Sequence, residues 1–135
     1  QIMALAKGGR VEKSDKGWGV GVATNQVIKS AQWMGSEIPA NFNLLVSHQD
    51  QVVDLPVEVT VLAESEFCPY FMVQWSRHLL SIQGHPEWCH EYSRGLINDR
   101  RHIIPENTVL AAIDSLTQTL DNTLLANWVI SFAKH

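Results

Sequence analysis

The sequence predicts an α/β domain built in three layers, of which this chain holds the later strands and helices. Short apolar strands occupy much of residues 42–83, and amphipathic helices follow from about residue 91. Strands that precede helices also fit an α+β arrangement. Residues 2–7, however, resemble the end of a helix, and this favours a three-layer domain whose first parallel strands lie upstream. We expect residues 1–135 to be the later portion of one domain.

The first 28 residues predict the end of a helix and then a hairpin. IMALAK is followed by Gly8 and Gly9, a pattern typical of a glycine C-cap. A native protein seldom starts inside a helix, so we expect upstream sequence to be missing. Residues 10–28 are rich in Val, Trp and Thr and have turn residues at 14–17, which predicts a hairpin.

The middle of the chain predicts a loop and then four strands. Residues 29–41 predict a loop with one helical turn around Trp33. FNLLVS at 42–47 shows little polar alternation, as expected of a strand covered on both faces. The remaining strands are predicted at 57–63, 70–75 and 79–83, with a tight turn between the last two.

The last third of the chain predicts three helices. The first covers residues 91–101 and ends in the charged cluster NDRRH before Pro105. Asn107 or Thr108 is expected to cap the second helix. The third starts at Asp121 or Asn122, and its apolar residues have the spacing of one buried stripe.

Composition and charge exclude several classes of protein. Hydrophobic residues make up 45% of the chain and charged residues 18%, as in ordinary globular domains. The net charge is -4 without a basic stripe, so we expect no nucleic-acid partner. No apolar run approaches the ~18 residues that cross a bilayer, and the start lacks the features of a signal peptide. We therefore expect no membrane partner and a soluble cytoplasmic protein, which two cysteines fit.

His85 and Glu87 form the strongest candidate for chemistry. Pro86 disfavours the α conformation at His85, and residues two apart in an extended chain point to the same side. A carboxylate beside an imidazole fixes its tautomer and leaves the other ring nitrogen free as general base and acid. The alternative is structural, with His85 a solvated loop residue and Glu87 a carboxylate at a helix N-terminus. Local geometry does not decide between them.

A second polar cluster, Ser47, His48, Gln49 and Asp50, follows another strand. Taken alone, His48 is a surface or hydrogen-bonded structural histidine. Two histidine-bearing strand ends in one small chain, however, indicate that both border one cleft. Sites of α/β sheets lie at such strand ends.

Metal and thiol chemistry are weaker alternatives. His85, Cys89 and His90 are zinc-ligand types, but no compact metal-binding spacing occurs, and we expect no metal site. Cys89 has the position of a thiol near a helix N-terminus, although its pattern fits helix packing better. Cys68 is a weaker candidate still. The chain has no Gly-x-Ser-x-Gly or Gly-x-Cys-x-Gly elbow.

Four stretches carry a resemblance to a known family, in the family's order along essentially the whole chain. They are GHPE at 84–87, VSHQDQVVDLP at 46–56, the opening QIMALAKGGRVEKSDKGWGVGV and the closing DNTLLANWVISFAKH. Together they resemble class I glutamine amidotransferase domains, in particular the stand-alone group similar to the amidotransferase part of GMP synthase. The resemblance implies a three-layer, flavodoxin-like fold whose N-terminal strands and nucleophile elbow are absent from this chain.

The resemblance also implies roles for six residues and no cofactor. The family's Cys-His-Glu triad releases ammonia from glutamine. By position, His85 matches the base and Glu87 the orienting carboxylate, while Ser47, His48 and Gln49 match a segment lining the glutamine pocket. Gln1 resembles the final residue of the Gly-x-Cys-x-Gly-x-Gln elbow, so the cysteine would lie four residues upstream. We expect the 135-residue chain alone to be inactive.

Two other functions remain open. One is a γ-glutamyl peptide hydrolase with the same triad, and the other is a catalytically inactive binding or regulatory module of the same fold. The expected partners are glutamine or a γ-glutamyl amide, and an acceptor or synthetase protein. Loss of the early strands exposes a sheet edge and an apolar face, so we also expect pairing with a second copy or fragment.

Overall fold

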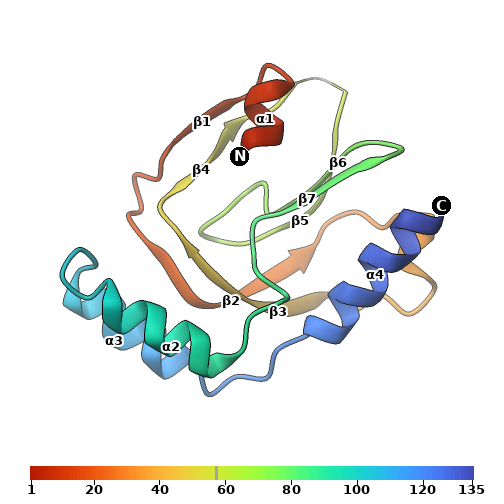
Figure 1. The fold of residues 1–135 in the computed structure, drawn as a ribbon. Coiled ribbons are helices and arrows are strands. Elements are labelled where there is room, and N and C mark those ends of the chain that lie inside the picture. Colours follow the sequence, from red (N-terminus) through yellow and green to blue (C-terminus); the bar gives the residue numbers. More distant parts are fainter. Residues whose placement is uncertain (57) are drawn as a thin grey trace.

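The computed structural model describes residues 1–56 and 58–135. This part of the chain forms four α-helices, one 3-10 helix and seven strands. Figure 1 shows how the α-helices and strands are arranged. In chain order the elements are α1 (Ile2–Ala6), β1 (Arg10–Lys13), β2 (Gly19–Val27), η1 (Gln32–Met34), β3 (Asn41–His48), β4 (Asp50–Asp54), β5 (Thr60–Glu64), β6 (Met72–Ser76), β7 (Leu79–Ile82), α2 (His90–Asp99), α3 (Glu106–Ser115) and α4 (Asn122–Lys134).

The described strands form two sheets. The larger has the order β3-β2-β5-β6-β7, and the smaller pairs β1 with β4. All of these pairings are antiparallel, so the parallel strands expected upstream have no counterpart among the described residues. The two sheets are joined directly, because β3 of the larger sheet is followed, after Gln49 alone, by β4 of the smaller sheet.

The predicted hairpin over residues 10–28 is wrong, although both of its strands exist. β1 pairs with β4, and β2 pairs with β3 and β5. Ser14 explains the difference: its backbone N–H donates to the carbonyl of Gln49 at 2.8 Å, and its hydroxyl accepts from Gln51 at 3.0 Å. The turn is therefore held on the β3–β4 junction, and β2 emerges from it into the other sheet.

Most other predicted elements are confirmed. The single helical turn around Trp33 is η1, and the hairpin of the last two strands is β6–β7. The strand predicted at 57–63 begins at Thr60, and Val57 lies outside the described residues. The cap predicted at Asn107 or Thr108 is wrong. The second helix begins earlier, after Pro105, whose carbonyl accepts the N–H groups of residues 108 and 109.

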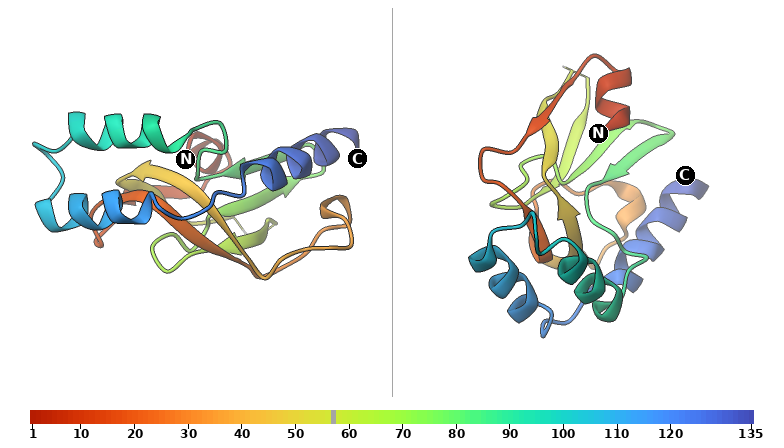
Figure 2. Two further views of the ribbon diagram at one scale, coloured as in Figure 1. Left: turned by 90° about the horizontal axis from the view of Figure 1, so that it is seen from below. Right: turned by 60° about the vertical axis from the view of Figure 1, so that its left-hand side comes forward.

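Strand β3 is covered on both faces, as its apolar sequence predicted. Phe42, Leu44 and Val46 belong to a core that includes residues of α4, whereas Leu45 belongs to a core built from α2 and α3. Figures 1 and 2 show α2 and α3 side by side at one end of the molecule and α1 with the small sheet at the other. The α/β class predicted from the sequence is thus confirmed as a curled sheet with helices packed on it.

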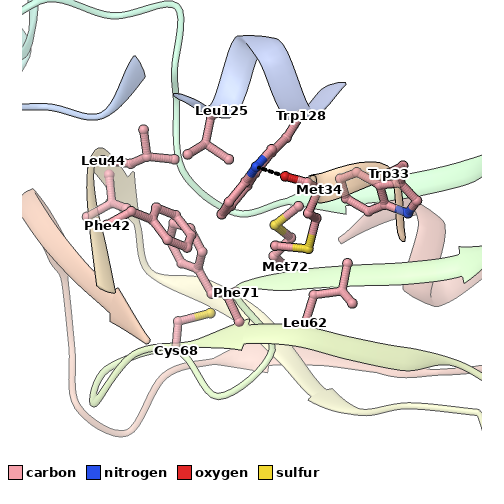
Figure 3. Close-up of a cluster of buried hydrophobic side chains, with 12 residues drawn as sticks. Trp33, Met34, Phe42, Leu44, Leu62, Cys68, Phe71, Met72, Leu125 and Trp128 are labelled. Atoms are coloured by element: carbon pink, nitrogen blue, oxygen red, sulfur yellow. Dashed lines mark hydrogen bonds between the residues drawn. The ribbon is translucent and has the colours of Figure 1, made fainter. Parts of the chain in front are cut away.

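The core that includes α4 is rich in aromatic contacts, which Figure 3 shows. The Phe42 ring meets those of Phe71 and Trp128 edge-on, with centroids 6.0 and 5.6 Å apart. The buried indole N–H of Trp128 donates to the carbonyl of Met34 at 3.0 Å. These contacts fix α4 against η1 and the sheet. In the described part of the chain, no helix has the length and apolar character needed to cross a membrane.

Candidate active site

The chain crosses from the end of β7 to β3 at Gly84. The N–H of Gln83 still donates to the carbonyl of Phe71 at 2.8 Å, whereas the N–H of His85 donates to the carbonyl of Leu45 at the same distance. Gly84 is buried between these two bonds. A Cβ there would lie 2.7 Å from the tip of the Phe71 ring and 3.2 Å from the Leu45 carbonyl oxygen. Only a residue without a side chain brings His85 this close to β3.

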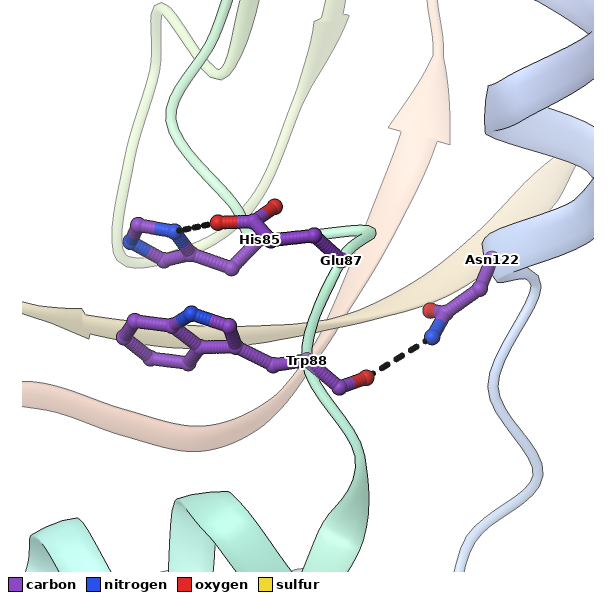
Figure 4. A network of polar contacts seen from close by, with 4 residues as sticks. All are labelled: His85, Glu87, Trp88 and Asn122. Atoms are coloured by element: carbon purple, nitrogen blue, oxygen red, sulfur yellow. Dashed lines mark hydrogen bonds and ion pairs between the residues drawn. The ribbon is translucent and has the colours of Figure 1, made fainter.

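The structure brings the His85 and Glu87 side chains into contact. His85 Nδ1 lies 2.8 Å from Glu87 Oε1, and Figure 4 shows the carboxylate beside the imidazole. The two side chains are 34% and 62% exposed, so the contact contributes at most about 1 kcal/mol to folding stability. Its structural effect is orientation. With Nδ1–H directed to the carboxylate, Nε2 is the nitrogen left free.

Trp88 fixes the plane of the His85 ring. The two rings are stacked, with centroids 3.7 Å apart and planes 1° from parallel (Figure 4). Trp88 is held in turn by Asn122 at the start of α4, whose side-chain amide donates to the Trp88 carbonyl at 2.9 Å. The N–H of Trp88 also donates to the carbonyl of His85 at 3.2 Å, which closes a tight turn. His85 is thus held by a carboxylate at one ring edge and an indole on one face.

A cleft of about 890 Å³ contains five of the six residues predicted from the sequence. Its wall includes Gln1, Ser47, His48, Gln49 and His85. Glu87 is not on the wall, because it contacts His85 from its Nδ1 edge. The hydrogen bond from His85 to Leu45 explains the convergence, since it sets the loop after β7 beside the end of β3.

His48 differs from His85 in its environment. Its side chain is buried, packs edge-on against Phe67, and has no hydrogen-bond partner among the described residues at either ring nitrogen. Burial, and then the positive charge of nearby His85, lowers the pKa of His48 from 6.5 to about 4. His48 is therefore a neutral imidazole near neutral pH.

Arg100 is a cleft residue that the sequence did not identify as part of a site. It is the C-cap of α2 and lines the same cleft. Its Nη1 donates to the hydroxyl of Ser47 at 2.7 Å, and its guanidinium carbon lies 6.0 Å from the centre of the Trp18 ring. In the sequence it was one charge of the helix-end cluster NDRRH, and no spacing relates it to a residue 53 positions earlier.

Known proteins resemble this chain in sequence and in fold. It is 36% identical over 95 residues to γ-glutamyl peptidase 5 of Arabidopsis thaliana, covering 67% of this chain and 38% of the relative. It is 39% identical over 93 residues to the glutamine-hydrolyzing GMP synthase of Psychrobacter arcticus, covering 67% of this chain and 17% of that protein. A glutamine amidotransferase of Thermotoga maritima superposes with a TM-score of 0.78 at 16% identity, covering 100% of this chain and 59% of that one. No family model matches the chain.

The resemblance to class I glutamine amidotransferase-like proteins is confirmed. The amidotransferase-like chain spans only part of each of these proteins, 38% of the peptidase and 59% of the solved structure. The superposition supports the fold, and the sequence matches carry the relationship.

Neither cysteine of the amidotransferase-like chain lines the cleft with His85. Cys68 is buried, and burial raises the pKa of its thiol to about 11, so it is a thiol and not a thiolate near neutral pH. Cys89 is exposed at the N-cap position of α2. Within residues 1–56 and 58–135, no group of three or more His, Cys, Asp or Glu side chains is arranged to hold a metal ion.

Proposed function

We propose that this chain carries the base and the substrate-holding wall of a Cys-His-Glu amide hydrolase that releases ammonia from glutamine. The observation that supports this most is the common cleft. His85, oriented by Glu87 at 2.8 Å, faces the same space as Ser47, His48 and Gln49. The relationship to a glutamine-hydrolyzing GMP synthase and to γ-glutamyl peptidases supports a γ-glutamyl amide as the substrate.

In the proposed reaction, His85 Nε2 accepts the thiol proton as sulfur attacks the γ-carbonyl carbon. The tetrahedral intermediate then loses its nitrogen, and His85 returns the proton to that nitrogen, so that ammonia or an amine departs and a thioester remains. Water, deprotonated by the same imidazole, cleaves the thioester to a carboxylate and the free thiol. Glu87 holds the Nδ1–H tautomer and stabilises the imidazolium between these steps.

We propose that the nucleophile is not supplied by residues 1–135. This agrees with the positions of Cys68 and Cys89 outside the cleft. Incubating the 135-residue chain with glutamine should give no ammonia above the rate of a His85→Ala variant. Clear turnover that His85→Ala abolishes would contradict this part of the proposal.

Binding by the same chain tests the substrate. L-Glutamine should shift the backbone amide NMR signals of residues 47–49 and the ring signals of His85. The exposed His102 ring should not shift and serves as an internal reference. Glutamine that shifts none of the cleft signals would overturn the substrate assignment.

A γ-glutamyl peptide is the second candidate substrate. It is favoured by the 36% identity to a γ-glutamyl peptidase. If the same cleft signals show that a γ-glutamyl dipeptide binds more tightly than glutamine, the peptidase is favoured over the glutaminase.

The alternative of a catalytically inactive binding module is tested by the codons upstream of Gln1. A Gly-x-Cys-x-Gly stretch there supports an enzyme, and unrelated sequence supports the module.

We further propose a protein partner and a reducing, cytoplasmic setting, because thiol catalysis needs a reduced cysteine. The presence of a GMP synthase among the related proteins favours an acceptor or synthetase protein as the partner.

Two features favour pairing with a second copy or fragment. Strand β7 is an edge strand of the larger sheet, and Ile2 and Leu5 of α1 are 85% and 58% exposed. Sedimentation that finds only a monomer at high concentration would contradict self-pairing.

A further inference from the structure

Arg100 is held rigidly on the wall of the cleft. Its backbone N–H donates to the carbonyl of Leu96 in the last turn of α2, and its own carbonyl accepts the N–H groups of Ile103 and Ile104. Ile104 is buried and anchors this turn in the core. The Arg100 side chain is half-buried and donates to the hydroxyl of Ser47 at 2.7 Å. The backbone of Arg100 is thus held by α2 and the turn that follows it, and the tip of its side chain is held by Ser47.

The charge of Arg100 is not paired with a carboxylate in the described part of the chain. The neighbouring Arg101 forms an ion pair with Glu106, whereas the guanidinium of Arg100 contacts only a hydroxyl and lies over the Trp18 ring. Lys13 and Asp50 are the other Lys, Arg, Asp or Glu residues on the cleft wall, and both are exposed. A guanidinium has five N–H donors in a planar fork, and the contact with Ser47 uses one of them, so donors remain that suit a planar anion.

We infer that Arg100 binds the α-carboxylate of the γ-glutamyl group, an inference that rests on the proposed function. Arg100 is fixed to Ser47, which belongs to the segment proposed to hold the glutamyl portion. His85 has to reach the opposite end of the substrate, where the leaving nitrogen takes up a proton. In a γ-glutamyl compound, three carbon atoms separate the scissile carbonyl carbon from the α-carboxylate carbon. A guanidinium at the glutamyl end therefore selects substrates that carry this carboxylate over simple amides.

Two ligands and three variants of the full 135-residue chain test the inference. L-Glutamine is compared with 4-aminobutanamide, which keeps the γ-amide and the amine but lacks the α-carboxylate. Calorimetry gives the dissociation constants, and the Arg100 Nε NMR signal reports the contact. The variants are Arg100→Gln, Arg100→Lys and, as a matched control, Arg94→Gln, which replaces an exposed arginine of the same helix.

We expect 4-aminobutanamide to bind roughly 10- to 100-fold more weakly than glutamine, the usual loss for one charge-assisted contact. Arg100→Gln should weaken glutamine binding by a similar factor and leave 4-aminobutanamide binding unchanged. Arg100→Lys should recover only part of the loss, because an ammonium lacks the planar fork. Arg94→Gln should behave as wild type, and the Arg100 Nε signal should shift with glutamine alone.

Two kinds of result would overturn the inference, and they are distinguishable. Glutamine binding that Arg100→Gln leaves unchanged, or equal affinity for both ligands, refutes the role of Arg100 and leaves the proposed function standing. Failure of both ligands to shift the signals of residues 47–49 and His85 refutes the inference and the proposed function together. If Arg100→Gln does not fold, the two-ligand comparison on the wild-type chain still decides.

Discussion

Replacing Gly84 by alanine tests how the fold places His85. The new Cβ would lie 2.7 Å from Phe71 Cζ and 3.1 Å from Leu44 Cβ, where ordinary contacts begin at 3.4 Å. The Phe71 ring must therefore retreat by about 0.7 Å, and it has little room to do so. It is 1% exposed and packs edge-on against Phe42. Overpacking of this kind in a core costs about 1–3 kcal/mol of folding free energy.

Urea unfolding followed by tryptophan fluorescence measures this cost. With a dependence of unfolding free energy on urea concentration typical of small domains, the urea concentration at the unfolding midpoint should be roughly 1–2 M lower for Gly84→Ala than for wild type. Gly95 offers the matched control, because it lies in α2 and a Cβ there meets nothing within 4 Å. Gly95→Ala should raise stability by about 0.5–1 kcal/mol through helix propensity. A Gly84→Ala midpoint equal to or above that of wild type would refute the packing argument.

Three further predictions concern single side chains. Glu87→Gln should raise the ratio of the Nε2–H to the Nδ1–H tautomer of neutral His85 by roughly 2- to 5-fold, because a partly exposed carboxylate contact is worth up to about 1 kcal/mol. The ring ¹⁵N chemical shifts of His85 measure this ratio. The free energy of unfolding should fall by about 3 kcal/mol as the pH drops from 6.5 to about 4, because the unfolded chain takes up a proton that buried His48 excludes. Iodoacetamide at mildly alkaline pH should label exposed Cys89 quickly, and buried Cys68 only after unfolding.

Each of these predictions has a result that contradicts it. An unchanged His85 tautomer ratio in Glu87→Gln would show that the carboxylate does not orient the ring. The stability slope between pH 6.5 and 4 should flatten in His48→Gln, and an identical slope in that variant would assign the proton uptake to other groups. Labelling of Cys68 in the native chain at the rate of Cys89 would contradict the burial of Cys68, with mass spectrometry locating each adduct.

Elements that depend on local sequence were predictable. The β6–β7 hairpin and the start of α4 follow from turn residues and apolar spacing within a few positions. The pairing of β1 with β4 was not predictable, because it joins residues about 40 positions apart, and only the whole fold decides between that partner and a local hairpin. The start of α3 was misplaced because Pro105 begins the helix with its carbonyl rather than with a capping side chain.

The candidate site divides in the same way. The contact of His85 with Glu87 follows from Pro86 and two-residue spacing, which is local information. The shared cleft depends on one long-range hydrogen bond, from His85 to Leu45. Arg100 could not be identified as a site residue from the sequence, because only its contact with Ser47 in the fold places it at the cleft. A charged helix end in a sequence indicates only a solvated surface.

The stacking of His85 on Trp88 determines at which stage the imidazole loses its rotational freedom. An unsupported imidazole would lose its rotational freedom each time a reaction began, and that loss would add to the barrier. Here parallel contact at 3.7 Å restricts the ring in the resting fold, and Asn122 ties the indole to α4. The cost is met once, during folding, by the packing of a distant helix. The C-terminal helix is thereby part of the preorganisation of the base, although it contributes no atom to the proposed chemistry.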